Sequence, residues 1–169
     1  MTHGQNLMCV AQLGAADPVL DAIAARLVAV PMRRVRSLDD VAVAAQQLCS
    51  TAEFVQTLAI VGHGQPGALQ VGYDATTPNH MKLRCIFTVE RGSGAALTRL
   101  ARAGLLRPTS EVLLLGCNVG RGPAGVALAR RLGCRVGLMT IALNYSDFAA
   151  DGLDAAVRHD WLLWADRRR

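Results

Sequence analysis

Two stretches decide the fold: Thr57–Gly64, which reads TLAIVGHG, and Glu111–Asn118, which reads EVLLLGCN. Each contains a continuous apolar run of strand length, a pattern typical of a strand buried on both faces of a parallel sheet. Each run ends in a glycine followed by a reactive side chain, His63 in the first stretch and Cys117 in the second. Ligands of open α/β sheets bind beyond the carboxyl ends of the strands. We therefore predict that the functional site lies at the carboxyl ends of these two strands.

Strands and helices alternate along the rest of the chain. Asp17-Pro18 is a favourable helix start, because Asp caps a helix and Pro suits its first turn. Ser37 with Asp40 three residues later resembles a capping box. Further strands are predicted at Leu7–Leu13, Arg33–Arg36, Gly67–Val71, Lys82–Val89 and Arg135–Leu143, and further helices at Leu97–Leu105, Pro123–Leu132 and Ser146–Trp164. This alternation predicts an α/β fold with a mainly parallel sheet covered on both faces.

Length and composition restrict the class of protein. A chain of 169 residues fits one domain, so residues 1–169 are predicted to fold as a single unit. The chain is 51% hydrophobic and 18% charged, which excludes intrinsic disorder, and no apolar run is long enough for a membrane span. The net charge is +5, but aromatic residues make up only 4%, so stacking platforms for nucleic acid are scarce. We expect no membrane and no specific nucleic-acid partner.

The cysteines indicate a reducing environment. Their number is odd and no CxxC pair occurs, which argues against a disulfide framework and against a zinc site. The first residues lack the basic segment and cleavage site of a signal peptide, so a cytoplasmic location is predicted. Secretion without a classical signal peptide stays an open alternative. No cofactor is predicted. The cysteines are Cys9, Cys49, Cys85, Cys117 and Cys134.

Cys117 and His63 form a chemically meaningful pair if their strands are neighbours. A thiol needs a base or a positive field to become a nucleophilic thiolate, and an imidazole supplies it. Gly62 and Gly64 flank the histidine, so the backbone there can approach a substrate closely. Small residues also suit an oxyanion hole built of backbone N–H groups. The pattern favours nucleophilic catalysis by the cysteine.

The two stretches resemble the caspase-like cysteine peptidases, which include caspases, clostripain, gingipains and separase. Those enzymes place histidine and cysteine after adjacent strands, and caspases separate the two by about 50 residues. Here Cys117 follows His63 by 54 positions. The longer phrases IVGHGQPGALQVG (Ile60–Gly72) and LLLGCNVGRGPAG (Leu113–Gly125) are similar to an uncharacterised caspase-like domain of large bacterial surface proteins. The resemblance covers about Leu58 to Leu143 and implies a three-layer α/β/α sandwich.

The resemblance also implies a role for each residue. Cys117 would be the nucleophile, His63 the general acid and base, and the N–H groups of Cys117 and Gly64 the oxyanion hole, with a protein or peptide as substrate. The Gln-Ala-Cys-x-Gly signature of caspases is absent, so their preference for aspartate does not carry over. Cys134 follows Cys117 by only 17 positions, which leaves no room for the long processing linker of caspases.

Specificity would come from a pocket beside Cys117. Asp147 and Asp151 follow the predicted strand Arg135–Leu143 and are candidate substrate-binding residues that would select arginine or lysine; Asp74 is another by position. Asn118, directly after Cys117, is a further substrate-binding candidate.

Two other functions stay open at this point. One is a catalytically inactive caspase-like module that binds a partner protein. The other is a nucleotide-binding, Rossmann-like domain, because Gly62–Gly67 and Gly120–Gly125 both match G-x-G-x-x-G. The first match precedes a predicted strand rather than a helix, and Pro123 in the second removes an N–H donor, so the nucleotide reading is the weaker of the two.

Overall fold

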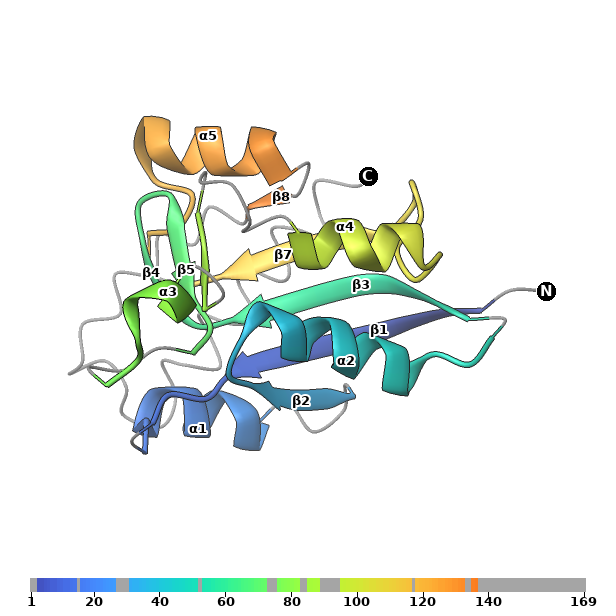
Figure 1. The fold of residues 1–169 in the computed structure, drawn as a ribbon, viewed down its shortest axis with the longest axis horizontal. Coiled ribbons are helices and arrows are strands. Elements are labelled where there is room, and N and C mark those ends of the chain that lie inside the picture. Colours follow the sequence, from blue (N-terminus) through green and yellow to red (C-terminus); the bar gives the residue numbers. More distant parts are fainter. Residues whose placement is uncertain are drawn as a thin grey trace.

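The computed structural model describes residues 3–14, 16–26, 31–51, 53–72, 76–82, 85–88, 95–116, 118–132 and 135–136. A central five-stranded sheet organises them, with strand order β2-β1-β3-β7-β8 (Figure 1). Every neighbouring pair in this sheet is parallel. The mainly parallel α/β sheet predicted from the sequence is therefore confirmed. Its strands are β1 (Gly4–Ala11), β2 (Met32–Val35), β3 (Phe54–Val61), β7 (Glu111–Leu115) and β8 (Arg135–Val136).

Helices connect the parallel strands, as parallel pairing requires. They are α1 (Pro18–Arg26), α2 (Leu38–Leu48), α4 (Ala95–Arg102) and α5 (Gly122–Leu132). In Figure 1, α2 and α4 lie side by side across the sheet, and the two helices contact each other. The arrows of β1, β3 and β7 point toward the same edge of the sheet. Any group that follows these strands is brought to that edge.

A small antiparallel sheet follows β3. It comprises β4 (His63–Gln65), β5 (Ala68–Gln70) and β6 (Ile86–Phe87), in that order. The predicted strand Lys82–Val89 is wrong at its start, because Lys82 ends the short helix α3 (Asn79–Lys82) and the Cys85 N–H donates to the Lys82 carbonyl at 2.9 Å. Among the described residues of this range, Ile86 and Phe87 are the ones that pair with β5.

Strand limits differ from the sequence prediction mainly at the amino ends. β1 starts at Gly4 rather than Leu7, because Gly4 pairs with Phe54 in β3 and extends the ladder through polar residues. At the other end of the chain, β8 is described only at Arg135–Val136. The remainder of the predicted strand to Leu143 and the predicted helix Ser146–Trp164 lie outside the described residues.

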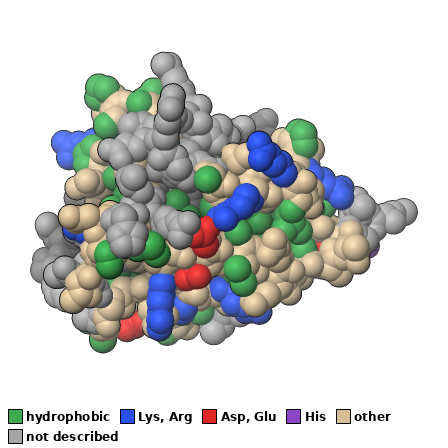
Figure 2. Space-filling model, in the orientation of Figure 1, with side chains coloured by type: hydrophobic (Ala, Val, Ile, Leu, Met, Phe, Trp, Pro, Cys, Tyr) green, Lys and Arg blue, Asp and Glu red, His purple; other side chains and the backbone are tan. Residues whose placement is uncertain are grey.

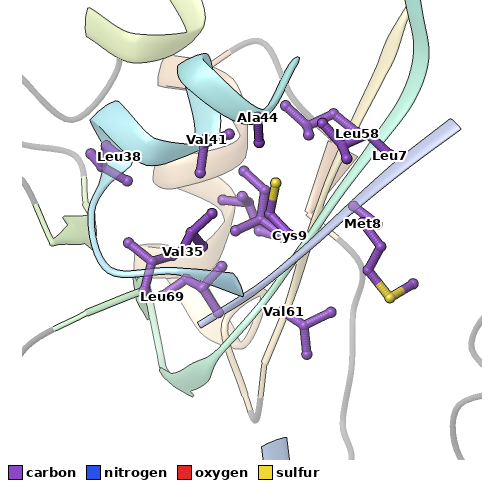
Figure 3. Packing of buried hydrophobic residues seen from close by; sticks show 14 of the residues in the cluster. Leu7, Met8, Cys9, Val35, Leu38, Val41, Ala44, Leu58, Val61 and Leu69 are labelled. Atoms are coloured by element: carbon purple, nitrogen blue, oxygen red, sulfur yellow. The ribbon is translucent and has the colours of Figure 1, made fainter. Parts of the chain in front are cut away.

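The core fills both sides of the central strands. Leu7, Met8, Cys9 and Val10 are consecutive in β1 and all are at least 98% buried, although successive side chains of a strand point to opposite faces. Figure 3 shows Leu7 and Cys9 directed toward α2, together with Leu58, while Met8 points away from that helix. This double-sided burial explains why the runs in the sequence are continuous rather than alternating.

Helix α2 begins at the predicted Ser37 cap, but the return bond of Asp40 goes to the N–H of Arg36, one residue before the cap, instead of the N–H of Ser37. The Ser37 hydroxyl accepts from the Asp40 N–H at 3.2 Å, and the Asp40 carboxylate accepts from the Arg36 N–H at 2.7 Å. Its apolar face turns inward, where Leu38 and Val41 are buried in the core, while Val43 is 47% exposed.

The two valines of α2 provide a matched test of this packing. We expect Val41→Ala to lower the free energy of unfolding by about 2 kcal/mol, because a fully buried side chain loses two methyl groups and leaves a cavity. Val43→Ala should change it by no more than about 0.5 kcal/mol, because Val43 faces water. Urea unfolding of both variants measures the difference. Equal effects would contradict the orientation of α2.

The surface above α2 and α4 carries charges of both signs. Figure 2 shows basic and acidic side chains interspersed on this face rather than gathered into a basic patch. Asp39 of α2 forms an ion pair with Arg99 of α4. No helix among the described residues is both long and apolar enough to cross a membrane.

Candidate active site

The ends of β3 and β7 lie directly beside each other. Val61 pairs with Leu115, and the Gly62 N–H donates to the Leu115 carbonyl at 3.0 Å, so the contact continues past the last strand residue. A Cβ on Gly116 would lie 2.7 Å from the Gly62 carbonyl oxygen, which only a glycine avoids. Gly62 and Gly116 directly precede His63 and Cys117, so the backbones leading to both predicted catalytic residues meet. Cys117 itself lies outside the described residues.

His63 begins β4 and its side chain is 44% exposed. Its Nε2 lies 2.5 Å from Oδ2 of Asp17, whose side chain is only 16% exposed. The other carboxylate oxygen of Asp17 accepts from the Leu20 N–H at 3.1 Å, at the start of α1. One carboxylate thus caps a helix and holds the histidine ring.

The sequence predicts only one of these two roles. Asp17 was predicted as a helix cap, but its contact with His63 joins residues 46 positions apart. A signal did exist: Asp17 follows β1, His63 follows β3, and β1 pairs with β3 in parallel as far as Val10 and Val61. Polar residues after neighbouring parallel strands share one edge of the sheet.

The backbone N–H of Gly64 lies next to His63 in β4. Gln65 and Ala68 flank the two-residue turn and form the hydrogen-bonded pair, so the next pair, Gly64 and Leu69, is not hydrogen-bonded. The Gly64 N–H therefore points away from β5, at the edge of the small sheet. This geometry suits the oxyanion-hole role predicted for Gly64.

The hairpin that carries His63 is anchored to the loop that follows Cys117. Gly67, with φ of 77°, forms its turn after Pro66, and the Gly67 N–H donates to the Val119 carbonyl at 2.9 Å. A Cβ on Gly67 would lie 2.8 Å from the Cβ of Ala124 in α5. The two halves of the predicted site are therefore held in fixed relation.

Asn118 adopts a left-handed backbone conformation, with φ of 57°. Asparagine tolerates this conformation better than most residues. The Asn118 carbonyl accepts from the Arg121 N–H at 2.9 Å, which closes the turn before α5. The substrate-binding role of Asn118 stays a prediction. The other specificity candidates, Asp147, Asp151 and Asp74, lie outside the described residues.

The three described thiols are poor nucleophiles. Burial raises the pKa of the Cys9 thiol to about 12. Burial also raises the pKa of Cys85 and of Cys49, and the carboxylates of Asp40 and Glu53, respectively, add to the effect. Cys85 is buried, with only 6% of its surface exposed. No cluster that could hold a metal ion occurs among the described residues.

Together, the fold and the site define an α/β protein with a histidine–aspartate pair at the carboxyl edge of a parallel sheet. Comparison with known families gives one match. The chain belongs to the family described as a domain of unknown function, DUF4347, which matches residues 15–163. The matched range includes Asp17, His63 and Cys117. No curated protein and no solved structure matches the chain.

Proposed function

We propose that this chain is a caspase-like cysteine peptidase in which Cys117 and His63 cleave a peptide bond. The observation that carries the proposal is the contact between Gly62 and Gly116, which brings the backbones before both residues to one edge of the sheet. The resemblance of Ile60–Gly72 and Leu113–Gly125 to caspase-like domains supports the same assignment.

The proposed fold is a three-layer α/β/α sandwich. Burial of Met8 and Val61, which lie on the face of the sheet turned away from α2, supports a cover on that side as well (Figure 3). A strand whose two faces are both buried requires a layer on each.

The proposed reaction proceeds through a thioester. His63 takes the proton of the Cys117 thiol, and the resulting thiolate attacks the substrate carbonyl carbon. The oxyanion accepts hydrogen bonds from the N–H groups of Gly64 and Cys117. The His63 imidazolium then protonates the leaving amine, and water hydrolyses the thioester with His63 as base. Asp147 and Asp151 are proposed to favour arginine or lysine at the cleaved position.

Nucleotide binding finds less support. The first G-x-G-x-x-G match, Gly62–Gly67, forms the β4–β5 hairpin instead of opening a helix. A dinucleotide site needs the glycine loop to lead into a helix N-terminus that faces the phosphates.

Thiol labelling tests the proposed nucleophile. At neutral pH we expect iodoacetamide to modify Cys117 faster than any other cysteine, because a neighbouring imidazole favours the thiolate. Cys9 and Cys85 should stay unmodified in the folded protein, since burial raises the pKa of both thiols. Mass spectrometry after brief labelling measures all five sites.

The His63→Ala variant is the control for this measurement. Its Cys117 should react more slowly, whereas labelling of the distant, partly exposed Cys49 should not change. Equal labelling of Cys117 and Cys49 in the wild-type protein would contradict an activated nucleophile.

A further inference from the structure

We propose that Asp17 is a positioning residue that fixes the tautomer of His63, with the proton on Nε2 and with Nδ1 as the proton acceptor. The use of Nδ1 as the catalytic base rests on the proposed function. The orientation and tautomer of the ring, in contrast, can be measured without any substrate.

The contact itself dictates the tautomer. Nε2 of His63 lies 2.5 Å from Oδ2 of Asp17. An ionised carboxylate can only accept hydrogen bonds, so the ring nitrogen facing it must carry the proton. A neutral imidazole then has an unprotonated Nδ1. Among the described residues, Nδ1 has no hydrogen-bond partner.

Asp17 is itself held in place from two directions. Its Oδ1 accepts from the Leu20 N–H at 3.1 Å, and its backbone carbonyl accepts from the Asp21 N–H at 2.8 Å. The first turn of α1 therefore fixes the carboxylate before it meets the imidazole. The carboxylate is also the deeper partner, at 16% side-chain exposure against 44% for His63. The ring is anchored on its inner side and open on its outer side.

This arrangement suits a base that must become charged. When Nδ1 takes the proton of a thiol, the ring becomes an imidazolium whose Nε2–H already donates to a carboxylate. In the Ser-His-Asp triad an aspartate bonded to the ring nitrogen that is not the base, there Nδ1, holds the correct tautomer and stabilises the imidazolium without becoming protonated. Asp17 would do the same from the start of α1.

Two substitutions separate this role from helix capping. Asp17→Asn and Asp17→Ser each keep a side-chain oxygen that can cap α1. The serine is too short to reach His63. With its oxygen on Leu20, the asparagine directs its NH₂ group at the ring and favours the opposite tautomer, with the proton on Nδ1. Asp21→Asn is the control, because Asp21 lies in the same first turn but pairs with Arg34 instead of His63.

The readout is the ¹⁵N chemical shifts of the imidazole nitrogens, measured by NMR at a pH where the ring is neutral. His63→Gln identifies the His63 signals among the four histidines. We expect an Nε2–H tautomer in the wild-type protein and in Asp21→Asn, an Nδ1–H tautomer in Asp17→Asn, and a mixture in Asp17→Ser, with similar melting temperatures throughout. An Nδ1–H tautomer in the wild-type protein overturns the proposal. So does an Asp17→Ser variant in which the Nε2–H tautomer is as dominant as in the wild type.

Peptide cleavage gives the second readout. In Asp17→Asn and Asp17→Ser we expect kcat to fall about 10²-fold with KM changed by less than about threefold, because orientation matters most in the transition state. Normal kcat in Asp17→Asn overturns the catalytic use of the ring. If the wild type cleaves no peptide but shows the expected tautomers, Asp17 still positions His63 and the peptidase proposal is the one that fails.

Discussion

Cys117→Ala is expected to abolish peptide cleavage, because no other group in the proposed site can form the thioester. His63→Ala should lose most of the activity, since general acid–base catalysis contributes about 10²–10⁴-fold. A peptide library incubated with each purified variant, and analysed by mass spectrometry, measures both effects. Repeating the screen at two ionic strengths tests the predicted acidic specificity pocket, because salt weakens exposed charge pairs.

Cys49→Ala is the matched control for these variants. Cys49 is a partly exposed residue at the end of α2, away from the carboxyl edge of the sheet, so removal of its thiol should leave cleavage intact. Cleavage that survives Cys117→Ala would show that another residue is the nucleophile. A folded wild-type protein that cleaves no library peptide would favour the alternative of a catalytically inactive, partner-binding module.

Apolar runs located the central strands because burial on both faces leaves little room for polar residues. Val112–Leu115 and Leu58–Val61 could be placed in this way, and so could the helix start at Ser37, whose capping pattern is local. The same reasoning placed His63 at the end of a buried strand. Each of these features depends on a few neighbouring residues, so the sequence alone carries the information.

Features that depend on distant contacts were missed. Nothing near Asp17 in the sequence reveals its contact with His63, because the contact forms only when β1 and β3 pair. The sequence does not predict the short helix Asn79–Lys82, because turn hydrogen bonds such as that from the Cys85 N–H to the Lys82 carbonyl depend on how the segment packs. The outward direction of the Gly64 N–H follows from the hairpin register, which the turn at Pro66-Gly67 sets.

Gly62→Ala is expected to destabilise the fold by about 3 kcal/mol or more, although it adds a single methyl group. The new Cβ would lie 2.0 Å from the Gln70 carbonyl oxygen. Neither backbone can move away easily, because the Gly62 N–H donates to the Leu115 carbonyl and Gln70 is paired with His63. Gly104→Ala is the control. Gly104 has φ of 72° but nothing within 4 Å of its Cβ position, so only backbone strain of about 1 kcal/mol is expected. Urea unfolding compares the two variants. If Gly62→Ala is as stable as Gly104→Ala, the β4–β5 hairpin does not pack against the end of β3. The placement of His63 would then be wrong.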